Sequence, residues 1–362
     1  MLPKTKDRFE EWLRMPLPRE ADDPRFEIRR AVPWEFERIY DLVDATFVVA
    51  RPRELYDWLY RHNPGGMARC WIVSEKHSGL LIGSAAHLPW PIARGEEALW
   101  GFQVGDAVAA PGFQRQGISE LRGRAHTWDP DYAKEIRFAW PNEKAIGHKR
   151  KQGHGSELLG PLSDGVWPLN PTARSRARGW LRLLTPAGSG PAGTSHRTGA
   201  GRRELAVEAV TRFDSAFDEA TQRYMSWRGF WSPHDADFLN WRYLDHPTRS
   251  YRALAVLEGE NVAGYCVIRS EGSRALLMEF AAPERGEVPR RLLQGALEVA
   301  RESACRRLTF FAPPGWCHWP SFRDAGLVDR HSSHFLWVDH SFLPAPSCLR
   351  DWQLMPGDHD DR

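Results

Sequence analysis

The chain has 362 residues, of which 42% are hydrophobic and 27% charged, a composition typical of a soluble globular protein that excludes a disordered chain and a coiled coil. At about 150 residues per domain, this length predicts two domains. Lys and Arg number 49 and Asp and Glu 47, which leaves a net charge of +2. Bulk charge therefore gives no reason to expect a nucleic-acid or membrane partner.

The N-terminal residues and the cysteines indicate the compartment. The first 20 residues are charged and lack the apolar core of a signal peptide, and no run approaches about 18 uninterrupted apolar residues. The five cysteines contain no CxxC pair, so we expect neither a disulfide framework nor a metal site. We predict a cytoplasmic protein.

The first half of the chain alternates strand-like and helix-like patterns. A strand-like run from residue 26 precedes apolar residues with the i, i+3, i+4, i+7 spacing of a helix, namely Phe36, Ile39, Tyr40 and Val43. The segment CWIVSEKHSGLLIGSAAHL then predicts two strands joined by a turn. A long strand, a helix, a further strand and a segment ending in glycine follow.

The second half repeats this order. The segment LYDWLYRHNP, from Leu55 to Pro64, matches FLNWRYLDHP, from Phe238 to Pro247, through a shared Trp-x-Tyr-x-x-x-Pro pattern. Residues 186–203 are rich in Gly, Pro and Ala and predict a flexible linker. We therefore predict an α/β (mixed α+β) protein of two tandem domains, 26–185 and 204–345, each a mixed central sheet flanked by helices.

Two shorter segments are interpreted structurally. HDAD, from His234 to Asp237, is typical of a cap for the helix that carries Phe238. DHDDR, from Asp358 to the end of the sequence, is typical of a frayed acidic tail.

A strand, a glycine-containing loop and a helix start follow one another in the first half. Val104 to Ala109 is strand-like, Pro111-Gly112 predicts a turn, and Gln114 to Ser119 leads into a helix near Glu120. The first N–H groups of a helix have no intrahelical partner, and the helix dipole places positive charge there. Gly117 lets consecutive amides point to one place, so we expect this loop to bind a diphosphate.

These segments resemble the GNAT acyltransferases. Gln114-x-x-Gly117-x-Ser119 is similar to their pyrophosphate signature Q-x-x-G-x-[GA], and FAWPNEKAIGHKRKQGH is similar to their fifth strand and the segment after it. The resemblance covers about residues 26–165. The second half keeps the outline but has EFAAPERGEVPRRLL in the equivalent place, where Glu284, Glu287 and Pro289 disfavour a diphosphate. It is therefore interpreted as a degenerate copy.

The resemblance implies an enzyme that transfers acetyl, or another acyl group, from its coenzyme A thioester to the amine of a small molecule, with an amino sugar favoured. It implies that strand backbone holds the pantetheine arm and loop amides hold the diphosphate. It also allows Arg115, Arg122 and Arg124 to reach the 3′-phosphate; the alternative for each is a solvated helix arginine. The predicted coenzyme-binding residues are Val108, Ala109, Gln114, Arg115, Gln116, Gly117, Ile118, Ser119 and Asn142.

Two residues are candidates for proton transfer. By its position on the fourth strand, Asp106 is the predicted general base; the alternative is that it supports a backbone kink. Lys149 stands where many relatives carry a Tyr that protonates the thiolate; the alternative is a solvated basic run, Lys149 to Lys151. Two alternative functions stay open: a FemAB-like aminoacyl-tRNA-dependent transferase, and a non-catalytic coenzyme A-binding or interaction protein.

Overall fold

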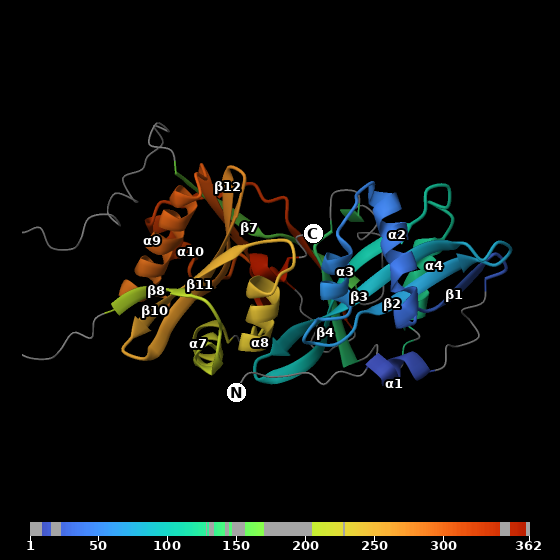
Figure 1. Ribbon diagram of the computed structural model, residues 1–362, viewed down its shortest axis with the longest axis horizontal. Coiled ribbons are helices and arrows are strands. Elements are labelled where there is room, and N and C mark those ends of the chain that lie inside the picture. The colour runs from blue at the N-terminus through green and yellow to red at the C-terminus, as the bar shows by residue number, and fades with distance from the viewer. Residues whose placement is uncertain are drawn as a thin grey trace, which may run out of the picture.

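Two mixed β-sheets lie side by side, each with helices packed against it (Figure 1). The computed structural model describes residues 9–15, 23–127, 129, 134–141, 145–146, 156–169, 205–226, 229–340 and 348–359. Within these ranges, no helix is both long enough and apolar enough to span a membrane.

The first sheet takes most of its strands from the first half of the chain. Its main series, in spatial order, is β1 (Phe26–Arg30), β2 (Arg69–Glu75), β3 (Leu81–Arg94), β4 (Glu97–Ala109), β5 (Glu135–Ala139), β15 (Phe335–His340) and β6 (Ser156–Pro161). Two short strands extend it, β9 (Phe230–Trp231) and β16 (Trp352–Gln353). The helices of this half are α1 (Phe9–Arg14), η2 (Pro33–Glu35), α2 (Phe36–Phe47), α3 (Arg53–Tyr60) and α4 (Ile118–Thr127).

The second sheet has the same plan. Its order is β8 (Leu205–Val210), β10 (Tyr251–Glu258), β11 (Asn261–Glu271), β12 (Arg274–Ala281), β13 (Arg307–Ala312), β7 (Ser163–Pro168) and β14 (Val328–Arg330). Its helices are α7 (Ser215–Met225), α8 (Ala236–Leu239), η4 (Asn240–Leu244), α9 (Glu287–Glu302) and α10 (Trp319–Asp324). The parallel pair β4–β5 of the first sheet corresponds to the parallel pair β12–β13 here. The predicted mixed α+β class with two tandem sheets is confirmed.

The two halves exchange one strand each. β7, from the first half, pairs with β13 and β14, while β15, from the second half, pairs with β5 and β6. Buried charges fix β15 in place, because Arg137 on β5 lies 3.3 Å from Asp339 on β15 and 3.2 Å from Glu135. The predicted ranges 26–185 and 204–345 remain a prediction, with this exchange across them; the linker at 186–203 lies outside the described residues.

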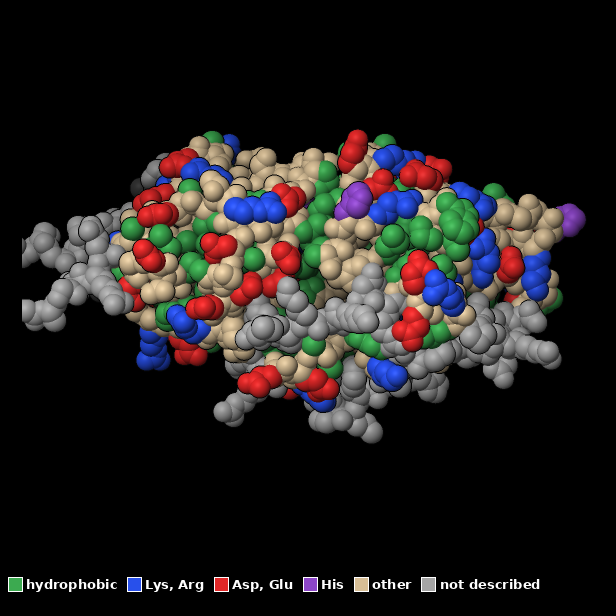
Figure 2. Space-filling view, turned by 60° about the horizontal axis from the view of Figure 1, so that its bottom comes forward, with side chains coloured by type: hydrophobic (Ala, Val, Ile, Leu, Met, Phe, Trp, Pro, Cys, Tyr) green, Lys and Arg blue, Asp and Glu red, His purple; other side chains and the backbone are tan. Residues whose placement is uncertain are grey.

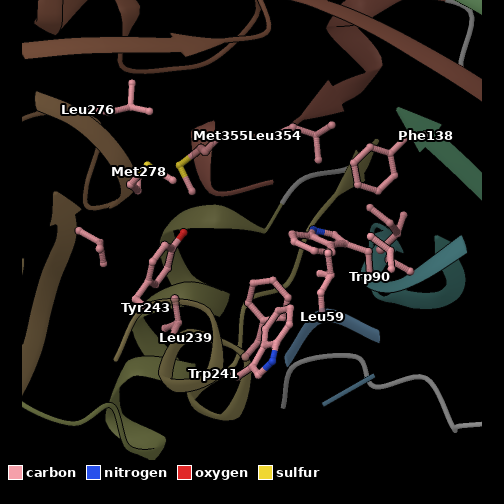
Figure 3. Packing of buried hydrophobic residues seen from close by; sticks show 14 of the residues in the cluster. Leu59, Trp90, Phe138, Leu239, Trp241, Tyr243, Leu276, Met278, Leu354 and Met355 are labelled. Atoms are coloured by element: carbon pink, nitrogen blue, oxygen red, sulfur yellow. The ribbon is translucent and has the colours of Figure 1, made fainter. Parts of the chain in front are cut away.

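The repeated Trp-x-Tyr pattern contributes a contact between the halves. The rings of Trp58 and Trp241, which are 183 positions apart, stack with centroids 4.3 Å apart. Each indole N–H donates to the main-chain carbonyl of the other residue, at 3.0 and 3.2 Å. Figure 3 shows Trp241 near Trp90 of β3 within one hydrophobic core that spans both halves.

The C-terminal segment, residues 348–359, lies where the halves meet (Figure 1). It contains η5 (Leu349–Asp351), β16 and η6 (Pro356–Asp358). The carboxylate of Asp358 accepts a hydrogen bond from Trp90 and lies 2.9 Å from Nε2 of His234. The main-chain carbonyl of Asp358 accepts hydrogen bonds from Gln103 and Trp140. The predicted frayed tail is therefore wrong for Asp358, which is buried because both halves supply it with donors.

His234 adds a buried ionisable side chain to this junction. Its two ring nitrogens lie 2.7 Å from Glu279 and 2.9 Å from Asp358, and all three side chains are buried. Burial alone would lower the pKa of His234, but the two carboxylates outweigh it and raise this pKa to about 10. The helix-capping role predicted for HDAD is confirmed at Asp235, which accepts a hydrogen bond from the Phe238 amide at 2.9 Å.

Replacing His234 by Gln should destabilise the protein and change its pH dependence. The raised pKa means that charged His234 stabilises the fold fully below about pH 6.5 and progressively less as pH rises toward 10. We expect His234→Gln to cost about 3–5 kcal/mol at pH 6 and to flatten the fall in stability between pH 7 and 10. Urea unfolding at several pH values measures both effects; an unchanged slope would contradict the assignment.

Candidate functional site

A β-bulge interrupts β4 in the first sheet. Ser84 pairs with Val108 and Ala86 with Gly105, so Asp106 and Ala107 together stand opposite a single residue of β3. Asp106 has a φ of +46°, in the left-handed region that Asp tolerates better than most residues. The bulge therefore sets the direction of the Asp106 side chain.

Donors from two segments meet the carboxylate of Asp106. The hydroxyl of Tyr60, the last residue of α3, donates to Oδ2 at 2.6 Å. Nη1 of Arg51, just before α3, lies 3.4 Å from Oδ1. Both Asp106 and Tyr60 are buried. The predicted general base is thus an ion-paired carboxylate held by the segment that contains the repeated motif.

The pairing of β4 with β5 ends near Gln103. Their parallel pairing runs from Trp100 with Glu135 to Gln103 with Phe138, and β4 then continues to Ala109 while β5 ends at Ala139. On its other side, β4 stays paired with β3 as far as Ala109. In the described residues, the edge of β4 that faces β5 therefore has no strand partner between Gln103 and the end of the strand at Ala109.

Ala109 and Val108 differ in what their backbone can offer at this edge. The amide of Ala110 donates to Ile82 of β3, and alternation along an antiparallel pair then directs Val108 toward β3 and Ala109 away from it. The carbonyl of Val108 also accepts from Nη1 of Arg122 at 2.9 Å. Of the two residues predicted to hold pantetheine, Ala109 is oriented for it.

Arg122 lies beneath the loop, so its predicted contact with a 3′-phosphate is wrong. Its guanidinium is buried and donates to the carbonyls of Val108 and Ser84 and to the hydroxyl of Ser119. Burial lowers the pKa of Arg122 to about 10. The side chain of Arg124 lies outside the described residues. Arg122 thus fixes the loop to the sheet and does not face a ligand.

The loop between β4 and α4 presents its amides outward. α4 begins at Ile118, two residues before the expected start, and the amide of Leu121 donates to the Gly117 carbonyl at 2.9 Å. Among the described residues, the backbone N–H groups from Gln114 to Ser119 donate no hydrogen bond. Arg115 and Gly117 have φ values of +62° and +86°, and a Cβ added at Gly117 would meet no atom within 4 Å. These unpaired donors at a helix start are what an anion requires.

Sequence analysis missed three residues of this region: Arg25 beside the loop, and Arg51 and Tyr60, which contact Asp106. The exposed Arg25 donates to the carbonyl of Gln116 at 3.3 Å and so brings its charge beside the loop. The repeated Trp-x-Tyr pattern is the signal that could have identified Tyr60, whereas no local pattern connects Arg25 with a loop 91 positions away. Asn142 and Lys149 lie outside the described residues.

The corresponding loop of the second half is built differently. Both helices carry an acidic residue in the first turn, Glu120 in α4 and Glu287 in α9, but in α9 it is the first residue of the helix, directly after Gly286. Pro289, also in that turn, has no N–H to offer. With a carboxylate at its first position and one amide fewer, the start of α9 is less suited to an anion than the start of α4.

Comparison with known proteins identifies the fold. No protein-family model matches the sequence, and no curated protein matches it. A probable N-acyltransferase from Enterococcus faecalis is similar in structure, with a TM-score of 0.61, 9% identity, and coverage of 86% of this chain and 71% of that one. A GCN5-related N-acetyltransferase from Anabaena variabilis has a TM-score of 0.60 and 13% identity, with coverage of 86% of this chain and 72% of that one. The N-myristoyltransferase of Saccharomyces cerevisiae, solved with bound myristoyl-CoA, has a TM-score of 0.53 and 12% identity, with coverage of 93% of this chain and 87% of that one.

These likenesses establish the class of fold. The chain has the fold of the GCN5-related N-acetyltransferases. Its two sheets are compatible with a tandem arrangement, and the fold-level likeness to N-myristoyltransferase extends over both of them.

Replacing Arg122 by Met should destabilise the protein even when no coenzyme is present. The change leaves the buried carbonyls of Ser84 and Val108 without this donor, at an expected cost of about 2–4 kcal/mol. Urea unfolding of the free protein measures the loss, with Arg115→Met as an exposed control on the same loop. Equal stability of the Arg122→Met protein and its parent would contradict the anchoring role.

Proposed function

We propose that the protein is an acyl-CoA-dependent N-acyltransferase that moves acetyl from acetyl-CoA to the amine of a small molecule. One observation carries the proposal: the open edge of β4 at Ala109 leads directly into a loop whose amides, Gln114 to Ser119, have no hydrogen-bond acceptor in the described chain.

The two parts suit the two ends of a coenzyme A molecule. The amide groups of the pantetheine arm can pair with an unpaired strand edge as an added strand does. The diphosphate suits the loop, where unpaired N–H groups and the dipole of α4 both favour negative charge. Arg25 and Arg115 add positive charge at the same end.

The reaction places its chemistry at the bulge. The amine nitrogen attacks the thioester carbonyl carbon, a C–N bond forms, the C–S bond breaks, and the product is an amide. Asp106 accepts the proton that the amine loses, directly or through one water. The thiolate sulfur takes up a proton, for which the sequence offers Lys149.

Surface charge favours coenzyme A over aminoacyl-tRNA as the donor. On the face that Figure 2 shows, Lys and Arg side chains are interspersed with Asp and Glu, and the net charge of the chain is only +2. Binding to tRNA is driven by phosphate contacts from a concentrated positive surface. The loop amides, by contrast, fit one diphosphate.

Replacing Gly117 by Glu should abolish acetyl-CoA binding. The new carboxylate would occupy the open space in front of the loop and repel the diphosphate, and we expect affinity to fall by more than about 100-fold, which is roughly 2.7 kcal/mol. Isothermal titration calorimetry measures the affinity.

Gly259→Glu is the matched control for this variant. Gly259 also has a positive φ, of +67°, and open space at its Cβ position, but it lies in the β10–β11 turn. Both variants therefore place a non-glycine residue at a positive φ. If Gly117→Glu binds acetyl-CoA as well as Gly259→Glu does, the diphosphate assignment is wrong.

Replacing Asp106 by Asn should separate catalysis from binding. The amide keeps the volume of the side chain but is no base, so kcat should fall by about 10²–10⁴-fold with the affinity for acetyl-CoA unchanged. Thiol release with an active acceptor measures kcat. A kcat within threefold of the parent would show that Asp106 supports the bulge only.

A further inference from the structure

The second half contains a copy of the Asp106 arrangement. Tyr243 is equivalent to Tyr60 in the repeated motif, and its hydroxyl donates to Oε1 of Glu279 at 2.5 Å. Glu279 lies on β12, the counterpart of β4, beside a register shift that corresponds to the bulge of β4. Each half therefore holds a tyrosine against a carboxylate at a bulge of its fourth sheet strand.

A cation completes both arrangements. His234 and Arg51 are separated by the same 183 positions as Trp58 and Trp241. Nδ1 of His234 lies 2.7 Å from Glu279, and Nη1 of Arg51 lies 3.4 Å from Asp106. The tyrosine, the carboxylate and the cation are thus all duplicated, although only the first half has a loop suited to a diphosphate.

In the second half this arrangement is filled by the chain itself. The backbone of Gly357 packs against the Tyr243 hydroxyl and the Glu279 carboxylate so closely that a Cβ there would collide with both. The carboxylate of Asp358, the next residue, lies 2.9 Å from Nε2 of His234, the nitrogen that faces away from Glu279. The occupant is therefore a small group beside the tyrosine–carboxylate pair, with a carboxylate on the cation.

In the first half the equivalent cation has donors to spare. Nη1 of Arg51 serves Asp106 and the hydroxyl of Tyr56, while Nη2 and Nε make no hydrogen bond within the described residues. The side chain is 18% exposed and lies beside the exposed ring of Phe47. Two adjacent guanidinium N–H groups that reach solvent match the two oxygens of a carboxylate.

We infer that the acceptor is an amine that also carries a carboxylate, a free amino acid or a short peptide. Its carboxylate binds Nη2 and Nε of Arg51, as Asp358 binds His234, and its amine faces Asp106 and Tyr60. The inference rests on the proposed function for the chemistry, but the carboxylate site itself does not depend on coenzyme A. It favours these acceptors over an amino sugar, which has no carboxylate to pair with Arg51.

The test uses matched acceptors that differ in one charge. Gly-Asp-NH₂ and the near-isosteric Gly-Asn-NH₂ represent peptides, and γ-aminobutyrate and butylamine represent free amines with and without a carboxylate. Turnover is followed by thiol release from acetyl-CoA, and binding is measured by calorimetry without coenzyme. We expect the acidic member of at least one pair to have a kcat/KM at least tenfold above its neutral partner.

Arg51 variants connect this preference with the residue. Arg51→Met should raise the KM of the acidic acceptor more than tenfold and that of the neutral one less than threefold, and Arg51→Lys should restore part of the difference. Because Arg51 also contacts Asp106, the ratio between paired acceptors is the readout, and a common fall in kcat does not enter it. Should Arg51→Met fail to fold, Arg51→Lys alone must reduce the ratio.

The outcomes separate this inference from the proposed function. Acetyl-CoA turnover with neutral acceptors used as well as acidic ones, or an unchanged ratio in the Arg51 variants, would overturn the inference and leave the function standing. Absence of acetyl-CoA binding would overturn the function. In that case the carboxylate site is still tested by calorimetry without coenzyme. Binding of the acidic acceptor but not of its neutral partner, lost in Arg51→Met, would support the site, and absence of such binding would overturn the inference.

Discussion

The bulge in β4 is the constraint on which the candidate site depends. It directs Asp106 toward Tyr60 and Arg51, and it lies between Gln103, where the pairing with β5 ends, and the open edge at Ala109. Arg122 fixes the loop end of the same strand by bonding Val108 from below. The carboxylate proposed as the base and the open strand edge therefore lie on one strand, which leads into the loop whose amides have no acceptor in the described chain.

Duplication gave this molecule two uses for one arrangement. In the first half, Arg51 is partly exposed beside the buried carboxylate of Asp106. In the second half, the C-terminal segment fills the same place, and His234, Glu279 and Asp358 become part of the junction between the sheets. The unsuitable helix start around Glu287 and the filling of this place by the C-terminal segment both fit the proposal that only the first half binds coenzyme and acceptor.

What could be predicted from the sequence was local. The strand, turn and helix start between Val104 and Ser119 are encoded by neighbouring residues, and the structure contains all three. The tandem plan was visible in the Trp58 and Trp241 motifs. The rest depends on contacts between distant segments: a helix arginine such as Arg122 is ordinarily exposed, and only the carbonyls of two strands explain its burial. The burial of Asp358 likewise requires donors from both halves, which no pattern near the end of the chain contains.

The reciprocal position of β7 and β15 has a consequence for how the chain can be divided. Neither half closes its own sheet, since the strand beside β5 comes from the second half and the strand beside β13 from the first. A cut between β7 and β8 would leave two fragments that still need each other for a complete sheet. The duplicated plan thus yields one cooperative folding unit, and a working enzyme from separate fragments would require that both be present and intertwined.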